Sequence, residues 1–297
     1  MKLSKKIVGA FTLLTLILIG CKNNDNKETI LQGTTSIIVD ESILPIVEDQ
    51  VAVFESKYKA KIKLIPQSES ECVNSITSGK GAIVILARKL YDSEVKVFAQ
   101  KKITPRQTQF ATDGIALICN KSNKDSLITV TDIIDFLNQK PSKIKGLVFD
   151  NPNSSTVSYL KNKAKLNTLP QKNIFSFNTN NQVIKYVAEN DGMIGVIGIN
   201  WIMQPNKETE KYLSKITTLK VKDQHKNDYF YPTQNNIAGT DYPLARDLYI
   251  INCQGGEGLG MGFASFMAGE IGQRIVLKSG LVPKTTPGRK IKITLKN

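Results

Sequence analysis

Hydroxyl and acidic side chains gather in three short segments of this chain, each of which follows a run of apolar residues. The segments are Asp40-Glu41-Ser42, Ser68-Glu69-Ser70-Glu71 and Asn153-Ser154-Ser155-Thr156. Where such a segment begins a helix, unpaired backbone N–H groups and the positive end of the helix dipole attract an anion, and neighbouring hydroxyls add donors. Several of these segments facing one gap would hold a small oxyanion. Taken singly, each is also consistent with an ordinary helix cap, because Ser and Thr are common there.

Arg88 supplies a positive charge of the kind that binds oxyanions. It lies in Ala87-Arg88-Lys89, directly after the fully apolar run at residues 82–86. A guanidinium group forms paired, charge-assisted hydrogen bonds with such anions. Glu69 and Glu71 have two possible roles: they could accept a hydrogen bond from a protonated anion, or they could be first-turn acids stabilised by the helix dipole.

The sequence contains few residues of the kinds that catalysis or metal binding requires. The single histidine, His225, lies in a polar stretch and no Gly-x-Ser-x-Gly motif occurs, so a secreted hydrolase would lack an evident nucleophile and base. Cys72, Cys119 and Cys253 show no Cys-x-x-Cys spacing, which argues against zinc. Cys119 and Cys253 could form a disulfide, but all three are also consistent with small buried hydrophobic side chains. We expect no enzyme activity, no metal and no cofactor.

The charge of the chain points to anions in general rather than to nucleic acid. Its 297 residues include 40 Lys and Arg against 26 Asp and Glu, a formal net charge of +14. Only five of the 40 are Arg, so the excess is Lys spread along the sequence, which attracts anions without selecting among them. A nucleic-acid binder needs clustered Arg and aromatic stacking surfaces, whereas the aromatic residues, 7% of the chain, lie mainly within apolar periods.

Residues 1–21 are typical of an export signal. Lys2, Lys5 and Lys6 precede an uncharged run at residues 7–20, which is short for a membrane span. The sequence Leu18-Ile19-Gly20-Cys21 resembles the bacterial lipobox, whose cysteine is acylated after cleavage. We therefore expect a mature protein that begins at Cys21 and is held on the outer side of a cell membrane by lipid, with residues 22–33 as a polar tether. The alternative is an uncleaved anchor helix.

Short apolar runs alternate with helical patterns along the rest of the chain. Strands are expected at residues 36–39, 62–65, 82–86, 114–119, 146–149 and 193–197, with helices between them. Fully apolar strands are typical of parallel sheets that are covered by helices on both faces. The pattern predicts an α/β fold, and the length favours two lobes.

A series of motifs then occurs in a consistent order over about residues 34–283. They are Ala87-Arg88-Lys89-Leu90 with Ser93-Glu94, Thr112-Asp113-Gly114-Ile115-Ala116, Asn153-Ser154-Ser155-Thr156, Gly192-Met193-Ile194-Gly195-Val196, the stretch at 242–250 and the segment at 272–283. In order and spacing they resemble the substrate-binding lipoproteins of ABC phosphate importers, whose corresponding motifs include Ser-Arg-Pro-Leu and a Ser-Gly-Thr anion loop. The resemblance implies a two-lobe periplasmic-binding-protein-like fold with a ligand cleft between the lobes, which close by a hinge.

The resemblance also implies an organisation of the chain and a set of partners. Lobe 1 would comprise residues 34–115 and 246–297, and lobe 2 residues 116–245, with crossing strands near 112–119 and 240–252. The partners would be inorganic phosphate and the permease of an ABC transporter, with the protein itself a monomer.

Site residues follow from the resemblance position by position. The expected donors to phosphate oxygens are Ser42, Ser70, Ser154, Ser155 and Thr156. Arg88 corresponds to the positive partner of the ligand, and Asp113 is either a ligand acceptor or a hydrogen-bonding residue of the hinge strand. Arg246 is expected to stabilise the returning strand.

Two departures from the family pattern bear on the choice of anion. Many members carry Arg just before the Ser-Gly-Thr loop, where this chain has Asp150, and many carry Asp at the end of the third strand, where this chain has only apolar residues. Such an acceptor distinguishes a protonated anion from sulfate, and Glu41, Glu69, Glu71 or Asp113 could replace it. Phosphate is the favoured ligand; the alternatives are another tetrahedral oxyanion such as sulfate or molybdate, and a sensor or adhesion lipoprotein without a transport role.

Overall fold

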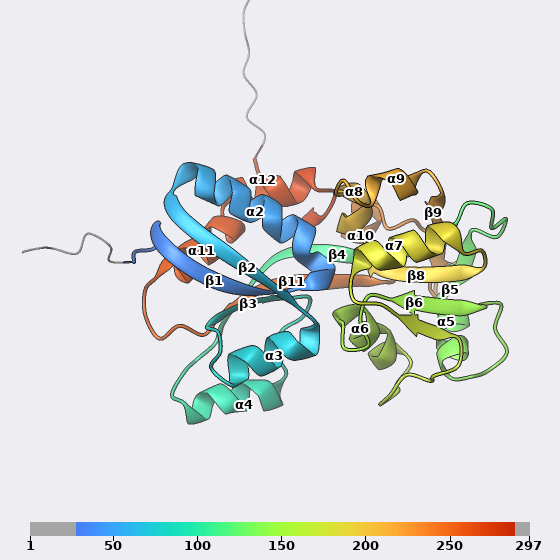
Figure 1. Ribbon diagram of the computed structural model, residues 1–297, viewed down its shortest axis with the longest axis horizontal. Coiled ribbons are helices and arrows are strands. Elements are labelled where there is room, and N and C mark those ends of the chain that lie inside the picture. The colour runs from blue at the N-terminus through green and yellow to red at the C-terminus, as the bar shows by residue number, and fades with distance from the viewer. Residues whose placement is uncertain (1–27, 289–297) are drawn as a thin grey trace, which may run out of the picture.

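The computed structural model describes residues 28–288, which form a mixed α/β structure around one long twisted sheet (Figure 1). Neighbouring strands follow the order β2-β1-β3-β11-β4-β8-β6-β7, and β12 and β9 also pair with β4. The strands are β1 (Gln32–Asp40), β2 (Lys59–Gln67), β3 (Ile83–Leu86), β4 (Arg106–Asn120), β5 (Leu127–Thr129), β6 (Gly146–Phe149), β7 (Ile174–Ser176), β8 (Met193–Gly198), β9 (Ile216–Thr218), β10 (Lys220–Lys222), β11 (Ala245–Asn252) and β12 (Val282–Pro283).

Helices cover both faces of this sheet. They are the 3-10 helix η1 (Glu41–Ile43) and the α-helices α2 (Leu44–Lys57), α3 (Glu69–Thr77), α4 (Asp92–Gln100), α5 (Val130–Leu137), α6 (Ser155–Lys163), α7 (Asn180–Glu189), α8 (Asn200–Met203), α9 (Glu210–Leu213), α10 (Gln234–Ala238), α11 (Leu259–Ala268) and α12 (Glu270–Lys278). None of the helices within residues 28–288 has the length and apolar character needed to cross a membrane.

The first lobe is built on β1, β2 and β3. These strands run parallel, and β3 is buried at all four positions because helices lie on both of its faces. Helices α2, α11 and α12 lie on one side and α3 and α4 on the other (Figure 1). Alternation along the strands separates two cores: Ile83 and Ile85 pack with α2 and α11, whereas Val84 and Leu86 pack with α3 and α4.

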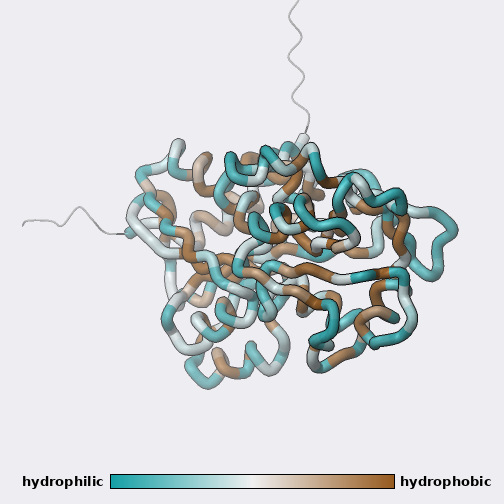
Figure 2. The backbone as a smooth tube through the Cα atoms, turned by 45° about the vertical axis from the view of Figure 1, so that its right-hand side comes forward, coloured by the Kyte–Doolittle hydropathy of each residue, from teal (hydrophilic) through white to brown (hydrophobic). Residues whose placement is uncertain are grey.

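The second lobe repeats this arrangement on β6, β7 and β8. Strand β6 is parallel to both neighbours. Its residue Val148 packs beneath α7, while Leu147 and Phe149 pack with α5 and α6 on the opposite face. In Figure 2 the hydrophobic backbone segments run through the interior of both lobes, and the hydrophilic segments lie mostly in the surrounding loops. The predicted α/β class and two-lobe architecture are therefore confirmed.

Two antiparallel strands join the lobes. Strand β4 pairs with β11 up to Gly114 and with β8 from Ile115 onward. The lobe boundaries expected from the sequence remain a prediction. The same ladder places Arg246 of β11 directly opposite Asp113 of β4.

Of the predicted signal peptide and tether, only the last part of the tether lies within the described residues. Residues 1–21, including Cys21, lie outside the described residues. The tether predicted at 22–33 is too long, because β1 begins at Gln32, which pairs with Lys59 of β2. The parallel pairing of β1 with β2 therefore includes Gln32 and Gly33, which the sequence predicted to belong to the tether.

The three cysteines of the described chain are free and buried. Cys119 belongs to the core of the second lobe, whereas Cys253 packs with α3 and α4 in the first. Burial raises the pKa of each thiol, that of Cys253 to about 11. They behave as small apolar side chains, the second of the two interpretations of the sequence.

Candidate functional site between the lobes

The first contribution to the site comes from the end of β1. The chain leaves the sheet at Asp40, whose Oδ1 accepts a hydrogen bond from the backbone N–H of Ser42 at 3.0 Å and so caps η1. Trp201 of α8 donates from Nε1 to the backbone carbonyl of Ser42 at 3.0 Å. These bonds fix a fully buried Ser42 with its hydroxyl directed toward the second lobe.

The second contribution is the N-terminus of α6. Ser154 is the N-cap, and its Oγ accepts from the backbone N–H of Val157 at 3.4 Å. Oγ of Ser154 also lies 2.9 Å from Oγ1 of Thr156, which donates to Oδ1 of Asp150 at 3.1 Å. Ser154, Ser155 and Thr156 are all buried. The sequence thus places three hydroxyls at a helix end whose dipole favours negative charge.

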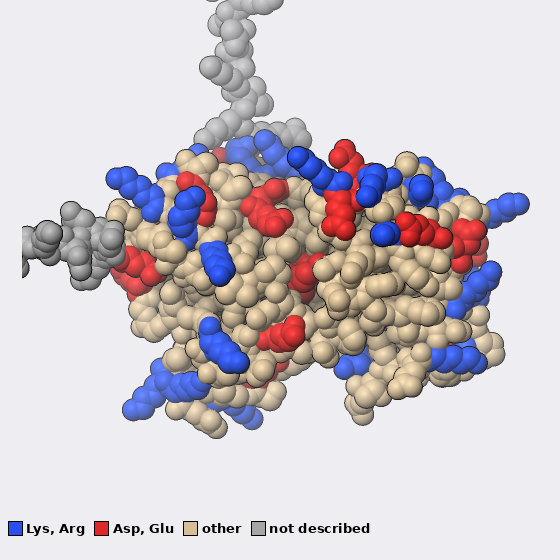
Figure 3. Space-filling view, viewed as in Figure 1, with Lys and Arg blue, Asp and Glu red and all other residues tan. Residues whose placement is uncertain are grey.

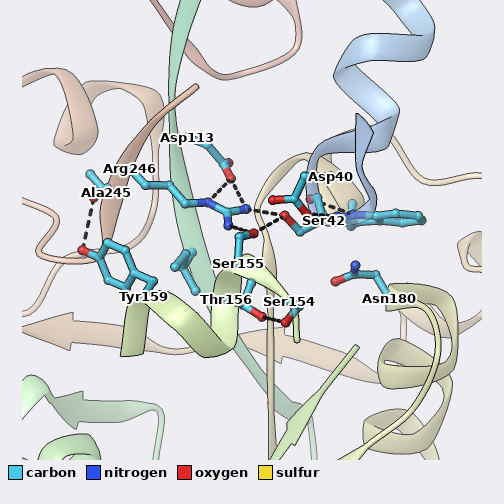
Figure 4. Close-up of polar contacts among 12 residues, drawn as sticks. Asp40, Ser42, Asp113, Ser154, Ser155, Thr156, Tyr159, Asn180, Ala245 and Arg246 are labelled. Atoms are coloured by element: carbon cyan, nitrogen blue, oxygen red, sulfur yellow. Dashed lines mark hydrogen bonds and ion pairs between the residues drawn. The ribbon is translucent and has the colours of Figure 1, made fainter. Parts of the chain in front are cut away.

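Arg246 connects the two contributions (Figure 4). Its Nε and Nη2 donate to Oδ2 of Asp113 at 3.1 and 2.9 Å, Nη1 donates to Oγ of Ser155 at 2.7 Å, and Nη2 also donates to Oγ of Ser42 at 3.1 Å. The hydroxyls of Ser42 and Ser155 lie 2.8 Å apart. Burial raises the pKa of Asp113, which the charge of Arg246 opposes. The guanidinium group of Arg246 therefore binds one hydroxyl from each lobe in addition to the carboxylate of Asp113.

Tyr159 of α6 binds the backbone that precedes Arg246. Its hydroxyl reaches the backbone carbonyls of Pro243 and Ala245 at 3.2 and 3.1 Å, so α6 is bound to the segment that leads into β11. Burial raises the pKa of Tyr159 to about 12, which keeps this hydroxyl protonated as a donor.

An acidic cluster lies beside these hydroxyls and also spans the lobes. Asn180 of α7 donates from Nδ2 to Oε2 of Glu41 and, at 3.2 Å, to Oδ2 of Asp150, and its backbone N–H lies 3.2 Å from Oε1 of Glu41. Burial, followed by the charge of Asp150, raises the pKa of Glu41 to about 8, and burial raises that of Asp150. Asp40 is completely buried and its Oδ2 has no hydrogen-bond partner within the described chain. In Figure 3 acidic side chains mark the junction of the two lobes, with much of the Lys and Arg nearer the ends of the molecule.

Arg88 has a separate set of partners. Its Nη1 and Nη2 donate to the two carboxylate oxygens of Glu94 at 2.8 and 2.9 Å, Nε lies 3.0 Å from Oε1 of Glu69, and the guanidinium carbon lies 3.8 Å from the centre of the Tyr91 ring. Ser70 is exposed, and its backbone N–H donates to the carbonyl of Asn153 across the lobes at 3.3 Å. Glu71 accepts from the backbone and hydroxyl of Ser68 as a capping box.

The structure therefore brings together most, but not all, of the residues expected from the sequence. Ser42, Asp113 and Ser155 meet in one network, with Ser154 and Thr156 beside it. Ser70 and Arg88 belong to other contacts. Arg246 was expected to stabilise the returning strand, but it also donates to one hydroxyl from each lobe. The sequence could have indicated this residue, because antiparallel pairing of the two crossing strands places Arg246 opposite Asp113. Asn180 carried no signal in the sequence. We refer to Ser42, Asp113, Ser154, Ser155, Thr156 and Arg246 as the interlobe site.

Within residues 28–288 no group of three or more His, Cys, Asp or Glu side chains is arranged to hold a metal ion. The hydroxyl, N–H and guanidinium donors of the interlobe site suit an anion instead.

Comparison with known proteins places this arrangement in a family. The chain is 24% identical over 302 residues to the phosphate-binding protein PstS of Borreliella burgdorferi, a match that covers 94% of this chain and 99% of that protein. Among solved structures, a substrate-binding protein of a phosphate ABC transporter from Clostridium perfringens, with bound phosphate, superimposes with a TM-score of 0.70 at 20% identity, over 85% of this chain and 100% of that one. An ABC-type phosphate transport receptor from Vibrio cholerae gives a TM-score of 0.63 at 15% identity, over 84% and 100% of the two chains.

The two solved structures show the same fold, and the sequence match extends over nearly the whole length of both chains. A family model for the PBP superfamily domain matches residues 26–270, which include every residue of the interlobe site. The chain belongs to the PBP superfamily.

Proposed function

We propose that this protein is a lipid-anchored, extracytoplasmic binding protein that captures inorganic phosphate for the permease of an ABC importer, without changing it chemically. The observation that carries the proposal is the convergence of Ser42, Ser155 and Arg246, which come from two lobes and a crossing strand. The relative from Borreliella burgdorferi is named a phosphate-binding protein, and the structure from Clostridium perfringens contains phosphate.

The donors are arranged so that a ligand would link the lobes. In the closed arrangement the hydroxyls of Ser42 and Ser155 contact each other and share Arg246. A tetrahedral anion entering between them would replace the Ser42–Ser155 contact with hydrogen bonds from both sides. Such a ligand favours the closed form because it contacts both lobes only there. The strands β4 and β11 would serve as the hinge.

Backbone N–H groups add to the side-chain donors that would surround the anion. Ser154, Ser155 and Thr156 lie at the N-terminus of α6, where backbone N–H groups add to their hydroxyls. Arg246 adds a full positive charge that is held rigidly by Asp113.

Asp40 is the group that favours phosphate over sulfate. Its buried Oδ2 has no hydrogen-bond partner within the described residues. Hydrogen phosphate carries a hydroxyl that can donate to such an oxygen, whereas fully ionised sulfate would place two acceptors against each other. From the sequence, Glu41, Glu69, Glu71 and Asp113 are further candidates for this role. Glu71 is engaged as a cap, and Glu69 and Asp113 are paired with arginines.

Calorimetric titration of the purified mature chain, beginning at Cys21, tests the proposal. We expect heat and a rise in melting temperature with phosphate, and weaker effects with sulfate and molybdate. An Asp40→Asn variant should lose part of the preference for phosphate over sulfate, while Asp92→Asn, on the exposed start of α4, serves as the control for net charge. Absence of heat and of any thermal shift with all three anions would contradict the oxyanion function.

A further inference from the structure

Two carboxylates of the acidic cluster beside the interlobe site, Glu41 and Asp150, have no role in the phosphate function described above. Asp40, Glu41 and Asp150 lie close together beside the interlobe site, and burial makes a negative charge on Glu41 or Asp150 costly. Both nearby arginines are already paired, Arg88 with Glu69 and Glu94 and Arg246 with Asp113. A site for a dianion would be expected to carry surplus positive charge; this one carries surplus carboxylates.

Asn180 makes this cluster a contact between the lobes. Its single amide nitrogen donates to Glu41 of the first lobe and to Asp150 of the second. The side chain of Asn180 is fully buried, and its own Oδ1 has no hydrogen-bond partner within the described chain. Closing the lobes therefore brings two carboxylates onto one neutral donor group, and no lysine or arginine is paired with either of them in the ion pairs of the described chain.

The positive charge nearest to Glu41 is already paired: Arg246, whose Nη2 lies 3.1 Å from Oγ of the adjacent Ser42, binds the carboxylate of Asp113. Strand β8, which packs against η1, has the sequence Met193–Gly198 and carries no titratable group. Helix α2, which follows η1, carries the acids Glu48, Asp49 and Glu55 beyond its first turn, and its Lys57 lies at the far end. Asp40 and Asp150 both oppose ionisation of Glu41.

We propose, resting on the phosphate function above, that the interlobe site takes up one proton together with its oxyanion, and that the Glu41–Asp150 pair holds this proton when Asn180 joins the lobes. The proton comes from solvent as the lobes close and returns to solvent as they open. Glu41 and Asp150 are then specificity-determining residues: they admit an anion only with the proton that offsets its charge. The raised pKa of Glu41, about 8, is consistent with this assignment, because opening would return the carboxyl to water and to its ordinary pKa of 4.5.

Proton uptake can be measured directly by titrating the mature chain with phosphate in buffers of different ionisation enthalpy, at pH 6 to 8. Phosphate itself exchanges protons in this range, so the quantity of interest is the difference between the parent and the variants Glu41→Gln and Asp150→Asn. Phosphate contributes equally to all three, and the amides keep the shape of the cluster. Glu189→Gln, at the exposed end of α7, removes the same charge outside the site and serves as the control.

We expect the parent and Glu189→Gln to take up close to one more proton per bound phosphate than Glu41→Gln. The affinity of the parent for phosphate should fall with rising pH by up to about tenfold per pH unit more steeply than that of Glu41→Gln. If the parent binds phosphate with the same proton uptake as both site variants, the proton inference is overturned and the phosphate function stands. If the parent binds no phosphate at any pH, both fall.

Discussion

The two arginines near the junction of the lobes differ in where their partners come from. Arg88 is held by Glu69 and Glu94, so its charge is neutralised by residues that lie close to it in the sequence of the first lobe. Arg246 is held by Asp113 and shares its remaining donors between Ser42 and Ser155, one from each lobe. An arginine that is satisfied within one lobe gains nothing when the lobes close, whereas one that bonds both lobes responds to their separation. The position of an arginine relative to the hinge therefore decides whether its charge can contribute to ligand binding.

Removal of Arg246 is the largest test of this difference. Arg246→Met should lower the free energy of unfolding by about 3–5 kcal/mol, because Asp113 would remain as a buried charge without a partner. It should also weaken phosphate binding about 10- to 100-fold through loss of a charged donor. Denaturant unfolding and calorimetry measure the two effects. Arg246→Lys keeps the charge but cannot bond Asp113 and both hydroxyls at once, so it should restore stability more than affinity. If Arg246→Met is as stable as the parent, the proposed difference between Arg246 and Arg88 is wrong.

The pH dependence of stability tests the acidic side of the same junction in the closed protein, measured at a saturating concentration of phosphate. Because the pKa of Glu41 is raised from 4.5 to about 8 in the folded chain, the folded state binds more protons than the unfolded state between these values. This contribution to stability is fully present below about pH 4.5 and is lost as the pH rises through about 8. The melting temperature of the parent should therefore fall over this window, and Glu41→Gln should flatten the fall. Parallel melting curves for the two proteins would show that Glu41 does not titrate in this window.

Ser155→Ala probes one hydroxyl of the network and should have an intermediate effect. The substitution removes the acceptor of Arg246 Nη1 at 2.7 Å and the contact with Ser42, while the helix backbone remains. We expect a loss of about 1–3 kcal/mol in the free energy of unfolding and about five- to tenfold in phosphate affinity. Ser279→Ala is the matched control, because that buried hydroxyl makes a single bond to the carbonyl of Ile275 far from the site. Equal effects of the two variants on phosphate affinity would argue against a ligand role for Ser155.

The sequence predicted the part of this molecule that depends on local pattern. Fully apolar runs predicted β3 and β6, and the hydroxyl segment Ser154-Ser155-Thr156 predicted a helix after it, because periodicity and capping are properties of neighbouring residues. The α/β class followed from the alternation of these elements, and the two lobes followed from the length of the chain and the family resemblance.

What the sequence could not give was the pairing of residues far apart in it. Arg246 meets Ser42 across 204 positions, and Asn180 meets Glu41 across 139. These contacts depend on the register of β4 with β11 and on where η1 and α7 come to rest. In the sequence Asp150 is only a departure from a family pattern, because its link to Glu41 through Asn180 exists only in the folded chain.

Arg88 gives the smallest expected effect and the sharpest contrast with Arg246. The sequence indicates Arg88 as the positive partner of the ligand, but both of its Nη groups are bonded to Glu94. Arg88→Ala should therefore change phosphate affinity by about twofold or less, since the charge removed is already neutralised within its own lobe. Glu94→Gln would instead free part of the guanidinium, and we expect it to strengthen phosphate binding slightly. Calorimetry on both variants decides the matter: loss of binding in Arg88→Ala, comparable with that in Arg246→Met, would place Arg88 at the ligand and require Glu94 to release it when phosphate binds.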